Sequence, residues 1–349
     1  MKNIIQTLLI LCFLSGCDSN HSGHVDAYTE LSFTEDKELT GEILDFEELK
    51  NPHRMLLRDS ILIISNKNTD RLISVFNVTQ QKSIGEFLHS GKGPHELTAV
   101  SSMSLNENSD LLLVNDHLMN KVFVYDLKHL DEIPFQPSLV IAPETKLENI
   151  QFLSEDILVG RPGFGEKADA RVTLLNKEGK THKSFGSFPE SQIEIPEMAL
   201  NRAYEFIPVG KSGDDSLVAL FNKITDLIEL YDTDGNLLKR MHGPDQFHPI
   251  IEMKNRNNAF VPAFVNGETR QAFQNPIERG GKLWVKYSGD AIDNYDTFFY
   301  ILVFDWELNP IARYKLSENI LSFDVDIAKR IIYVLATNDG EPMVKTYSY

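Results

Sequence analysis

Cysteine is scarce in this chain of 349 residues, which has only Cys12 and Cys17. Both stand near the N-terminus, so the rest of the chain has no thiol that could form a disulfide or attack a substrate. A fold without disulfides depends on its hydrophobic core, and a chain of this length can bury one without covalent help. Hydrophobic residues make up 42% and charged residues 24%, which excludes the composition of a disordered protein.

Basic residues are also few, with 34 Lys and Arg against 51 Asp and Glu, for a formal charge of -17. Such a charge repels polyanions, so we expect no nucleic-acid partner. The chain contains no GxSxG, no GxxxxGK[ST] and no GxGxxG after a strand. The nucleophile elbow and the two common phosphate-binding loops are therefore excluded.

The N-terminus has the pattern of an export signal. Residues 1–3 carry a lysine, and an apolar stretch from Ile4 to Leu14 follows, interrupted only by Gln6 and Thr7. It is too short to span a bilayer. It ends in LSGC (14–17), which resembles the lipobox of bacterial lipoproteins, where signal peptidase II cleaves before a lipid-modified cysteine. The resemblance implies a signal peptide over 1–16 and a lipid on Cys17.

A cleaved secretory signal with an incidental Cys17 is the alternative. We expect residues 17–38 to comprise the lipidated cysteine and a tether, because 18–26 (DSNHSGHVD) are small and polar. The lipid on Cys17 would then attach the protein to a membrane of the cell envelope, on the periplasmic or cell-surface side. The sequence leaves the membrane and the leaflet open.

A short strand that ends in an apolar pair followed by Asp or Asn recurs along the chain. The five copies are VFN, VYD, LLN, LYD and VFD, and they end at residues 77, 126, 176, 232 and 305, at spacings of 49, 50, 56 and 73. About fifty residues is the length of one four-stranded propeller blade. Another apolar run precedes each copy, so each repeat contains a hairpin, and the terminal Asp or Asn suits the turn that follows.

A sixth unit spans LSFDVD (321–326), RIIYVLA (330–336) and PMVKTYSY (342–349), and the chain then ends one strand short of a full blade. Residues 39–46 (LTGEILDF) could supply the missing outer strand. The predicted fold is therefore an all-β, six-bladed β-propeller over 39–349 with four-stranded antiparallel blades, closed by an N-terminal strand in the last blade.

Two stretches carry a family resemblance. LLLVNDHLMNKVFVYD (111–126) is similar to the NHL-type propeller repeat, and LIISNKNTDRLISVFN (62–77) is a weaker copy. GEFLHSGKGPHEL (85–97) resembles the inter-blade linker of the same group. Together with the lipobox, the chain resembles the TolB-like six-bladed propeller lipoproteins of Gram-negative bacteria. The resemblance implies the fold and an envelope location, but no defined biochemical role.

Asp116, His117, Asn120 and Lys121 form the most polar loop of the better copy. We interpret Asp116 and Asn120 as residues that brace the hairpin through backbone hydrogen bonds, with a ligand role as the alternative. The glycine-rich run GRPGFG (160–165) opens no helix, and we expect it to be a blade loop with Arg161 directed into the channel.

The longest spacing indicates an insertion at about 245–281, within the fifth blade. It has four acidic and four basic residues, so all the excess negative charge lies elsewhere in the chain. Arginine with aromatic residues is typical of recognition surfaces, so we expect a ligand to contact Arg256, Phe260, Phe264 and Arg270. The alternative is that these side chains only extend the blade packing.

The sequence favours a binding role over catalysis. The ten histidines are scattered, and we expect no catalytic residue, no metal and no cofactor. The prediction is a lipid-anchored, monomeric propeller that binds a protein, peptide or glycan. The alternative is a metal-dependent enzyme of the gluconolactonase or lyase type, which would need convergent ionisable groups in the channel.

Overall fold

The computed structural model describes residues 26–28, 31–46, 49–106, 109–132, 134–163, 170–190, 194–213, 215–256, 258–292, 297–338 and 340–349. The predicted signal peptide and the lipidation site Cys17 lie outside these residues and stay predictions.

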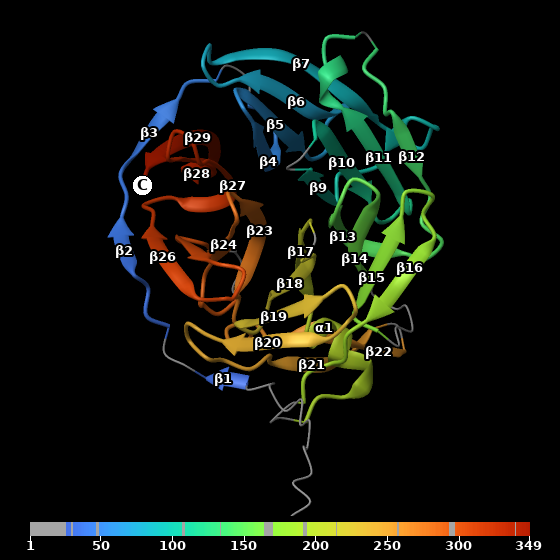
Figure 1. The fold of residues 1–349 in the computed structure, drawn as a ribbon, viewed down its shortest axis with the longest axis vertical. Coiled ribbons are helices and arrows are strands. Elements are labelled where there is room, and N and C mark those ends of the chain that lie inside the picture. The colour runs from blue at the N-terminus through green and yellow to red at the C-terminus, as the bar shows by residue number, and fades with distance from the viewer. Residues whose placement is uncertain are drawn as a thin grey trace, which may run out of the picture.

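Six sheets surround a central channel, which confirms the predicted six-bladed β-propeller (Figure 1). Each sheet has four antiparallel strands, and a fifth strand pairs in parallel with the fourth in blades 1, 4 and 5. Successive sheets along the chain are neighbouring blades. From the channel outward, blade 1 consists of β4 (Pro52–Arg58), β5 (Ile61–Asn66), β6 (Arg71–Asn77) and β7 (Lys82–Ser90), extended by β8 (Glu96–Leu97). Blade 2 consists of β9 (Ser102–Leu105), β10 (Leu111–Asp116), β11 (Lys121–Asp126) and β12 (Leu139–Ile141). Blade 3 consists of β13 (Leu147–Phe152), β14 (Ile157–Pro162), β15 (Val172–Asn176) and β16 (Thr181–Phe185).

Blades 4 to 6 follow the same order, and the N-terminal segment contributes strands to all three. Blade 4 consists of β17 (Phe206–Lys211), β18 (Leu217–Asn222), β19 (Leu227–Asp232), β20 (Leu237–His242) and β1 (Asp26–Tyr28). Blade 5 consists of β23 (Phe273–Arg279), β24 (Lys282–Tyr287), β25 (Tyr300–Phe304), β26 (Pro310–Lys315) and β2 (Glu35–Glu38). Blade 6 consists of β27 (Asn319–Asp326), β28 (Ile331–Asn338), β29 (Glu341–Ser348) and β3 (Gly41–Leu44).

The hydrophobic core is divided among the six interfaces between neighbouring blades. Each interface holds a cluster of buried apolar side chains from the two facing sheets. For example, the rings of Phe221 in blade 4 and Phe273 in blade 5 meet edge to face at 5.6 Å. Burying one such side chain contributes about 1.5–3 kcal/mol. Every blade therefore depends on both of its neighbours for stability.

The repeated Asp or Asn at the end of each third strand initiates the turn that follows. Asn77, Asp126, Asn176, Asp232 and Asp305 each accept a hydrogen bond from a backbone N–H two to four residues further on. The polar side chain satisfies amide groups that the sheet leaves unpaired. This confirms the role in the turn that the sequence predicts for these residues.

The ring closes in blade 6, where β3 pairs with β29 in the register Gly41↔Tyr347 to Leu44↔Val344. A Cβ atom on Gly41 would lie 2.5 Å from the Tyr347 ring, so this pairing needs glycine. The N-terminal segment first passes along the outer edges of blades 4 and 5, where β1 and β2 pair in parallel with β20 and β26 (Figure 1). The predicted tether, residues 17–38, overlaps these two strands.

The structure locates the insertion between blades 4 and 5. It contains the hairpin of β21 (Ile251–Arg256) and β22 (Ala259–Phe264), whereas the last part of the predicted 245–281 insertion is β23, the innermost strand of blade 5. The pairing of β23 with β24 shifts register between Gln274 and Ile277, and Pro276 lies within the shift. This bulge disrupts the strand pattern that would have identified β23 in the sequence.

The innermost strands run parallel to one another around the channel. Bonds between blades 2 and 3 join Ser102 to Ile150 and Ser104 to Phe152, so both strands advance in the same direction. We call the face where the innermost strands begin the top face. The described helices are short, and none is long and apolar enough to span a membrane.

Candidate functional site

Two long connections lie on the top face, next to each other beside blade 4. The connection from β16 to β17 contains η2 (Glu197–Ala199) and α1 (Leu200–Ala203), and the connection from β20 to β23 contains the hairpin β21–β22 (Figure 1). Ile251 of the hairpin packs on a small cluster formed by Ala203, Tyr204 and Leu227. The Arg202 guanidinium also lies 3.9 Å from the centre of the Phe264 ring. We call these two connections together the platform.

Exposed apolar side chains gather on the top-face connections. Phe260 is 62% exposed on the hairpin, Met198 is exposed on η2, and Ile250 directly precedes β21. Leu118, 66% exposed, lies on the top-face turn of blade 2. Among the described residues, the other exposed large apolar side chains lie on the fourth strands of the blades, except Ile327 on the opposite face. The top face is therefore the face best suited to contact a partner.

Five charged side chains meet where the platform borders the channel. Glu205, just before β17, lies 2.6 Å from Arg202 Nη1, 2.7 Å from Lys223 Nζ and 3.6 Å from Arg161 Nη2. Arg161 also pairs with Glu148 on β13. Three cations thus surround two carboxylates, which leaves a local charge of +1 in an acidic protein.

Neither Glu205 nor His53 at this mouth titrates near neutral pH. Burial alone would raise the pKa of Glu205, but Lys223, Arg161 and Arg202 lower it to about 2. The pKa of His53 falls to about 3 through burial and the charges of nearby cations. An acid–base catalyst works best with a pKa near the working pH. These two groups are instead each held in one protonation state.

A cavity of about 400 Å³ opens at this mouth, and four blades contribute to its walls. The residues that line it include His53 and Lys67 from blade 1, His117 from blade 2, Glu148 from blade 3 and Lys223 from blade 4. We call it the top cavity. Its size is that of a small ligand site.

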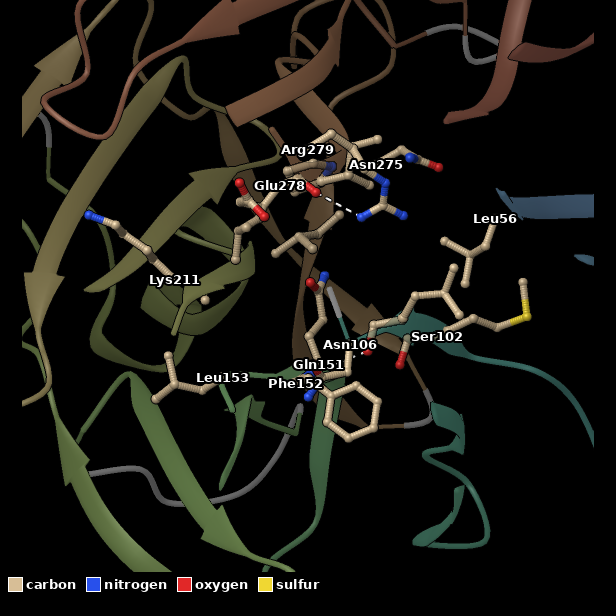
Figure 2. Close-up of a pocket in the computed structure, with 18 of the residues that line it drawn as sticks. Leu56, Ser102, Asn106, Gln151, Phe152, Leu153, Lys211, Asn275, Glu278 and Arg279 are labelled. Atoms are coloured by element: carbon tan, nitrogen blue, oxygen red, sulfur yellow. Dashed lines mark hydrogen bonds between the residues drawn. The ribbon is translucent and has the colours of Figure 1, made fainter. Parts of the chain in front are cut away.

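A second cavity of about 380 Å³ continues along the channel toward the opposite face, and Asn149 lines both cavities. We call it the channel cavity. Figure 2 shows Gln151 projecting into it from β13, with Phe152 beside it and Glu278 and Arg279 above. Arg279 is held in place by hydrogen bonds of 2.8 Å to both carboxylate oxygens of Asp324.

A buried ion cluster lies between blades 3 and 4. Glu229 on β19 is fully buried and pairs with Arg171, which directly precedes β15, and with Arg240 on β20. The Arg171 guanidinium lies 5.1 Å from the centre of the Phe206 ring and also donates to Asn222. Burial raises the pKa of Glu229, but the two arginines outweigh it and lower the pKa overall.

The structure separates the predicted ligand-binding residues into three places. Arg161 lies at the channel mouth, whereas Arg256, Phe260 and Phe264 lie on the hairpin. Arg270 follows the hairpin, donates to Asp245 at 2.9 Å and lies 4.4 Å from the centre of the Phe247 ring. The hairpin and the mouth adjoin through Arg202, which contacts both Phe264 and Glu205.

Asp116 and Asn120 make contacts with the backbone. The Asp116 carboxylate accepts hydrogen bonds from the N–H groups of Thr98, Ala99, Leu118 and Met119. Burial raises its pKa, but the hydrogen bonds from Thr98 and from the backbone outweigh burial and lower it. Asn120 donates to the Pro143 carbonyl at 2.6 Å. These contacts connect the turn of blade 2 to the linkers on both of its sides.

The family match agrees with this architecture. The sequence matches the family described as TolB-like 6-blade propeller-like over residues 32–328. The chain belongs to this family. No curated protein matches the chain in sequence.

Two solved structures resemble this TolB-like propeller. One is a protein of Bacteroides fragilis NCTC 9343 that is described as exported, with 12% identity, a TM-score of 0.52, and coverage of 91% of this chain and 99% of the other. The other is a member of the DUF4221 family from Bacteroides vulgatus ATCC 8482, with 11% identity, a TM-score of 0.53, and coverage of 89% and 97%. At these identities the likeness establishes the fold alone.

Sequence reasoning missed most of the residues that line the mouth of this TolB-like channel. His53, Glu148 and Glu205 stand at or next to the start of an innermost strand, and Lys67 and Lys223 stand in the turns after second strands. Once the blade register is assigned, these two positions of each repeat point to the mouth. Within the described ranges, no group of three or more His, Cys, Asp and Glu side chains is placed to bind a metal ion.

Proposed function

We propose that this TolB-like propeller is a lipid-anchored protein of the bacterial cell envelope that binds a protein, peptide or glycan at its top face without catalysing a reaction. The observation that carries this proposal is the set of exposed apolar side chains on the top-face connections, led by Phe260, beside the cations of the channel mouth. Exposed aromatic side chains near arginine are the composition enriched in binding hot spots.

The lipobox and the N-terminal strands support the envelope location. Residues 18–25 alone separate the predicted lipid on Cys17 from β1, which lies on the outer edge of blade 4. A chain of this length reaches at most about 30 Å when extended. The lipid would therefore hold the propeller near the membrane by its edge, and the top face would stay open to a partner.

The protonation states at the mouth favour binding over the alternative of a gluconolactonase-like or lyase-like enzyme. Glu205 and His53 have pKa values of about 2 and about 3. Asp226 comes closer to neutrality, because burial raises its pKa to about 6. However, backbone N–H groups of Asp245 and Phe247 donate to its carboxylate. It therefore acts as an anchor for the connection that follows β20.

Replacing Phe260 tests this function. We expect the soluble body from Asp18 to capture an envelope component, and Phe260→Ser to retain about tenfold less of it, because truncating a hot-spot aromatic typically costs more than about 1 kcal/mol. Ile327→Ser, which changes an exposed apolar residue on the opposite face, is the matched control. Equal retention by both variants would place binding elsewhere.

Cys17→Ser tests the anchor separately. If signal peptidase II processes the chain, this substitution removes the acylated thiol, and metabolic labelling with a palmitate analogue should fall to background. The protein should then remain unprocessed or appear in the soluble fraction. Labelled, membrane-bound Cys17→Ser protein would exclude the lipobox.

A further inference from the structure

The two cavities of the channel carry positive charge in an otherwise acidic protein. Their lining includes five cationic side chains, Arg54, Lys67, Lys211, Lys223 and Arg279. It includes three acidic ones, Glu148, Glu205 and Glu278. The lining thus has a net charge of +2, whereas the whole chain has -17. A cleft of one sign within low-dielectric walls concentrates ions of the opposite sign.

The acidic side chains of this lining already have partners. Glu205 is surrounded by Lys223, Arg202 and Arg161, and Glu148 pairs with Arg161. Glu278 accepts a hydrogen bond from the Gly281 N–H at 2.7 Å. Glu205 and Glu148 therefore already pair with cations of the mouth.

Arg54, like Lys211, is a cation of this lining with which no described carboxylate pairs. It lines the channel cavity, its Nε atom is buried, and no described residue presents a carboxylate or another hydrogen-bond acceptor to its guanidinium. Burial also lowers the pKa of Arg54, and no acidic neighbour opposes this shift. The side chain as a whole is only partly buried, so the unpaired cation is accessible from the cavity. A cation without a counter-ion in such a cleft attracts an anion.

His53, the residue before Arg54, is affected by the positive charges around the channel. Burial, followed by the charges of Arg54, Lys67 and Lys286, lowers the pKa of His53 to about 3, and no carboxylate contributes to the shift. The imidazole is therefore neutral at physiological pH, so it can donate a hydrogen bond without adding charge. His53 lines the top cavity, so a ligand reaching Arg54 from the top face would pass it.

We propose that the channel binds an oxyanion, the carboxylate or phosphate group of a ligand, at the Arg54 guanidinium. The planar guanidinium offers paired N–H donors that match two oxygens of such a group. Ser102 and Ser104 from blade 2 and Gln151 from blade 3 line the same cavity and supply neutral polar groups around the anion. This inference rests on the proposed binding function and specifies the chemistry of what is bound.

Calorimetry with small probes tests the site without a partner present. Inorganic phosphate, galacturonate and N-acetylglutamate are titrated at constant ionic strength, with galactose as the neutral counterpart of galacturonate. We expect at least one anion to bind and galactose not to bind. The anion that binds then identifies a phosphate, an acidic sugar or an acidic peptide as the source of the group.

Arg54→Gln should weaken that binding about tenfold or more, because one charge-assisted pair is lost. Arg54→Lys should restore part of it. Lys82→Gln, which removes an exposed cation from β7 on the outside of the same blade, is the matched control and should bind as the wild type does. Equal binding by Arg54→Gln and wild type would overturn the proposal, as would wild-type protein that binds none of the three anions at millimolar concentration.

Thermal melting gives a second readout that separates this site from a structural role. Without anion, Arg54→Gln should melt at or above the wild-type temperature, because an unpaired cation is removed. The bound anion should raise the melting temperature of the wild type only. A strongly destabilised Arg54→Gln would contradict the site. If an anion binds the wild type and Arg54→Gln weakens that binding, but no partner binds the top face, only the proposed function is contradicted.

Discussion

A chain that lacks residues 320–349 is expected to lose the cooperative thermal transition of the whole propeller. The deletion removes almost all of β27 and all of β28 and β29, and with them the buried interfaces of blade 6 with blades 5 and 1. It also removes the acceptors Ser322 and Asp324, to which the N–H groups of Met55 and Leu57 donate. The two neighbouring blades would then expose apolar faces that no other part of the ring can cover.

Differential scanning calorimetry and near-ultraviolet circular dichroism measure this loss. A chain that starts at Asp26 is the control, because it keeps every strand among the described residues. It should melt as the full body does. A C-terminally deleted chain that melts with unchanged midpoint and cooperativity would contradict a closed ring.

Glu229→Gln is expected to destabilise the propeller by about 3–5 kcal/mol, because it leaves buried Arg171 and Arg240 without their counter-charge. Glu229 accepts from Arg240 through Nε and Nη2 at 3.1 and 2.9 Å, and it also bonds Arg171 from the neighbouring blade. The loss therefore affects the interface of blades 3 and 4 as well as blade 4 itself.

Urea unfolding at pH 7 gives the change in free energy. Glu252→Gln is the matched control, since Glu252 pairs with Lys254 on the hairpin, where the two side chains are 41% and 47% exposed. Exposed pairs contribute about 0–1 kcal/mol, so this variant should unfold near the wild-type midpoint. A loss below about 1 kcal/mol for Glu229→Gln would indicate that water or a rearranged side chain compensates the arginines.

The repeat is predictable because it recurs in the same two strands of each blade. The second and third strands are buried on both faces, and the third ends in a turn residue such as Asn176 or Asp232, whose side chain bonds the following backbone. The innermost strands are harder to recognise. β13 and β23 contain register shifts next to Asn149 and Asn275, which adopt positive φ, so their alternation is interrupted.

The site is less predictable because its residues are far apart in the sequence. A glycine-rich run points to Arg161, but its partners Glu148 and Glu205 come from two different blades. Arg54 has no motif at all, and only its surroundings in the folded chain single it out. Composition points to Phe260, whereas its exposure depends on how the hairpin packs on α1.

Site-specific photo-crosslinking in the producing cells tests whether the top face binds a partner. A benzophenone amino acid is placed at position 260 on the hairpin, or at position 327 on the opposite face. We expect a discrete crosslinked species from position 260 and none from position 327. Crosslinks from position 327 alone would contradict binding at the top face and would place the binding surface on the other face of the ring.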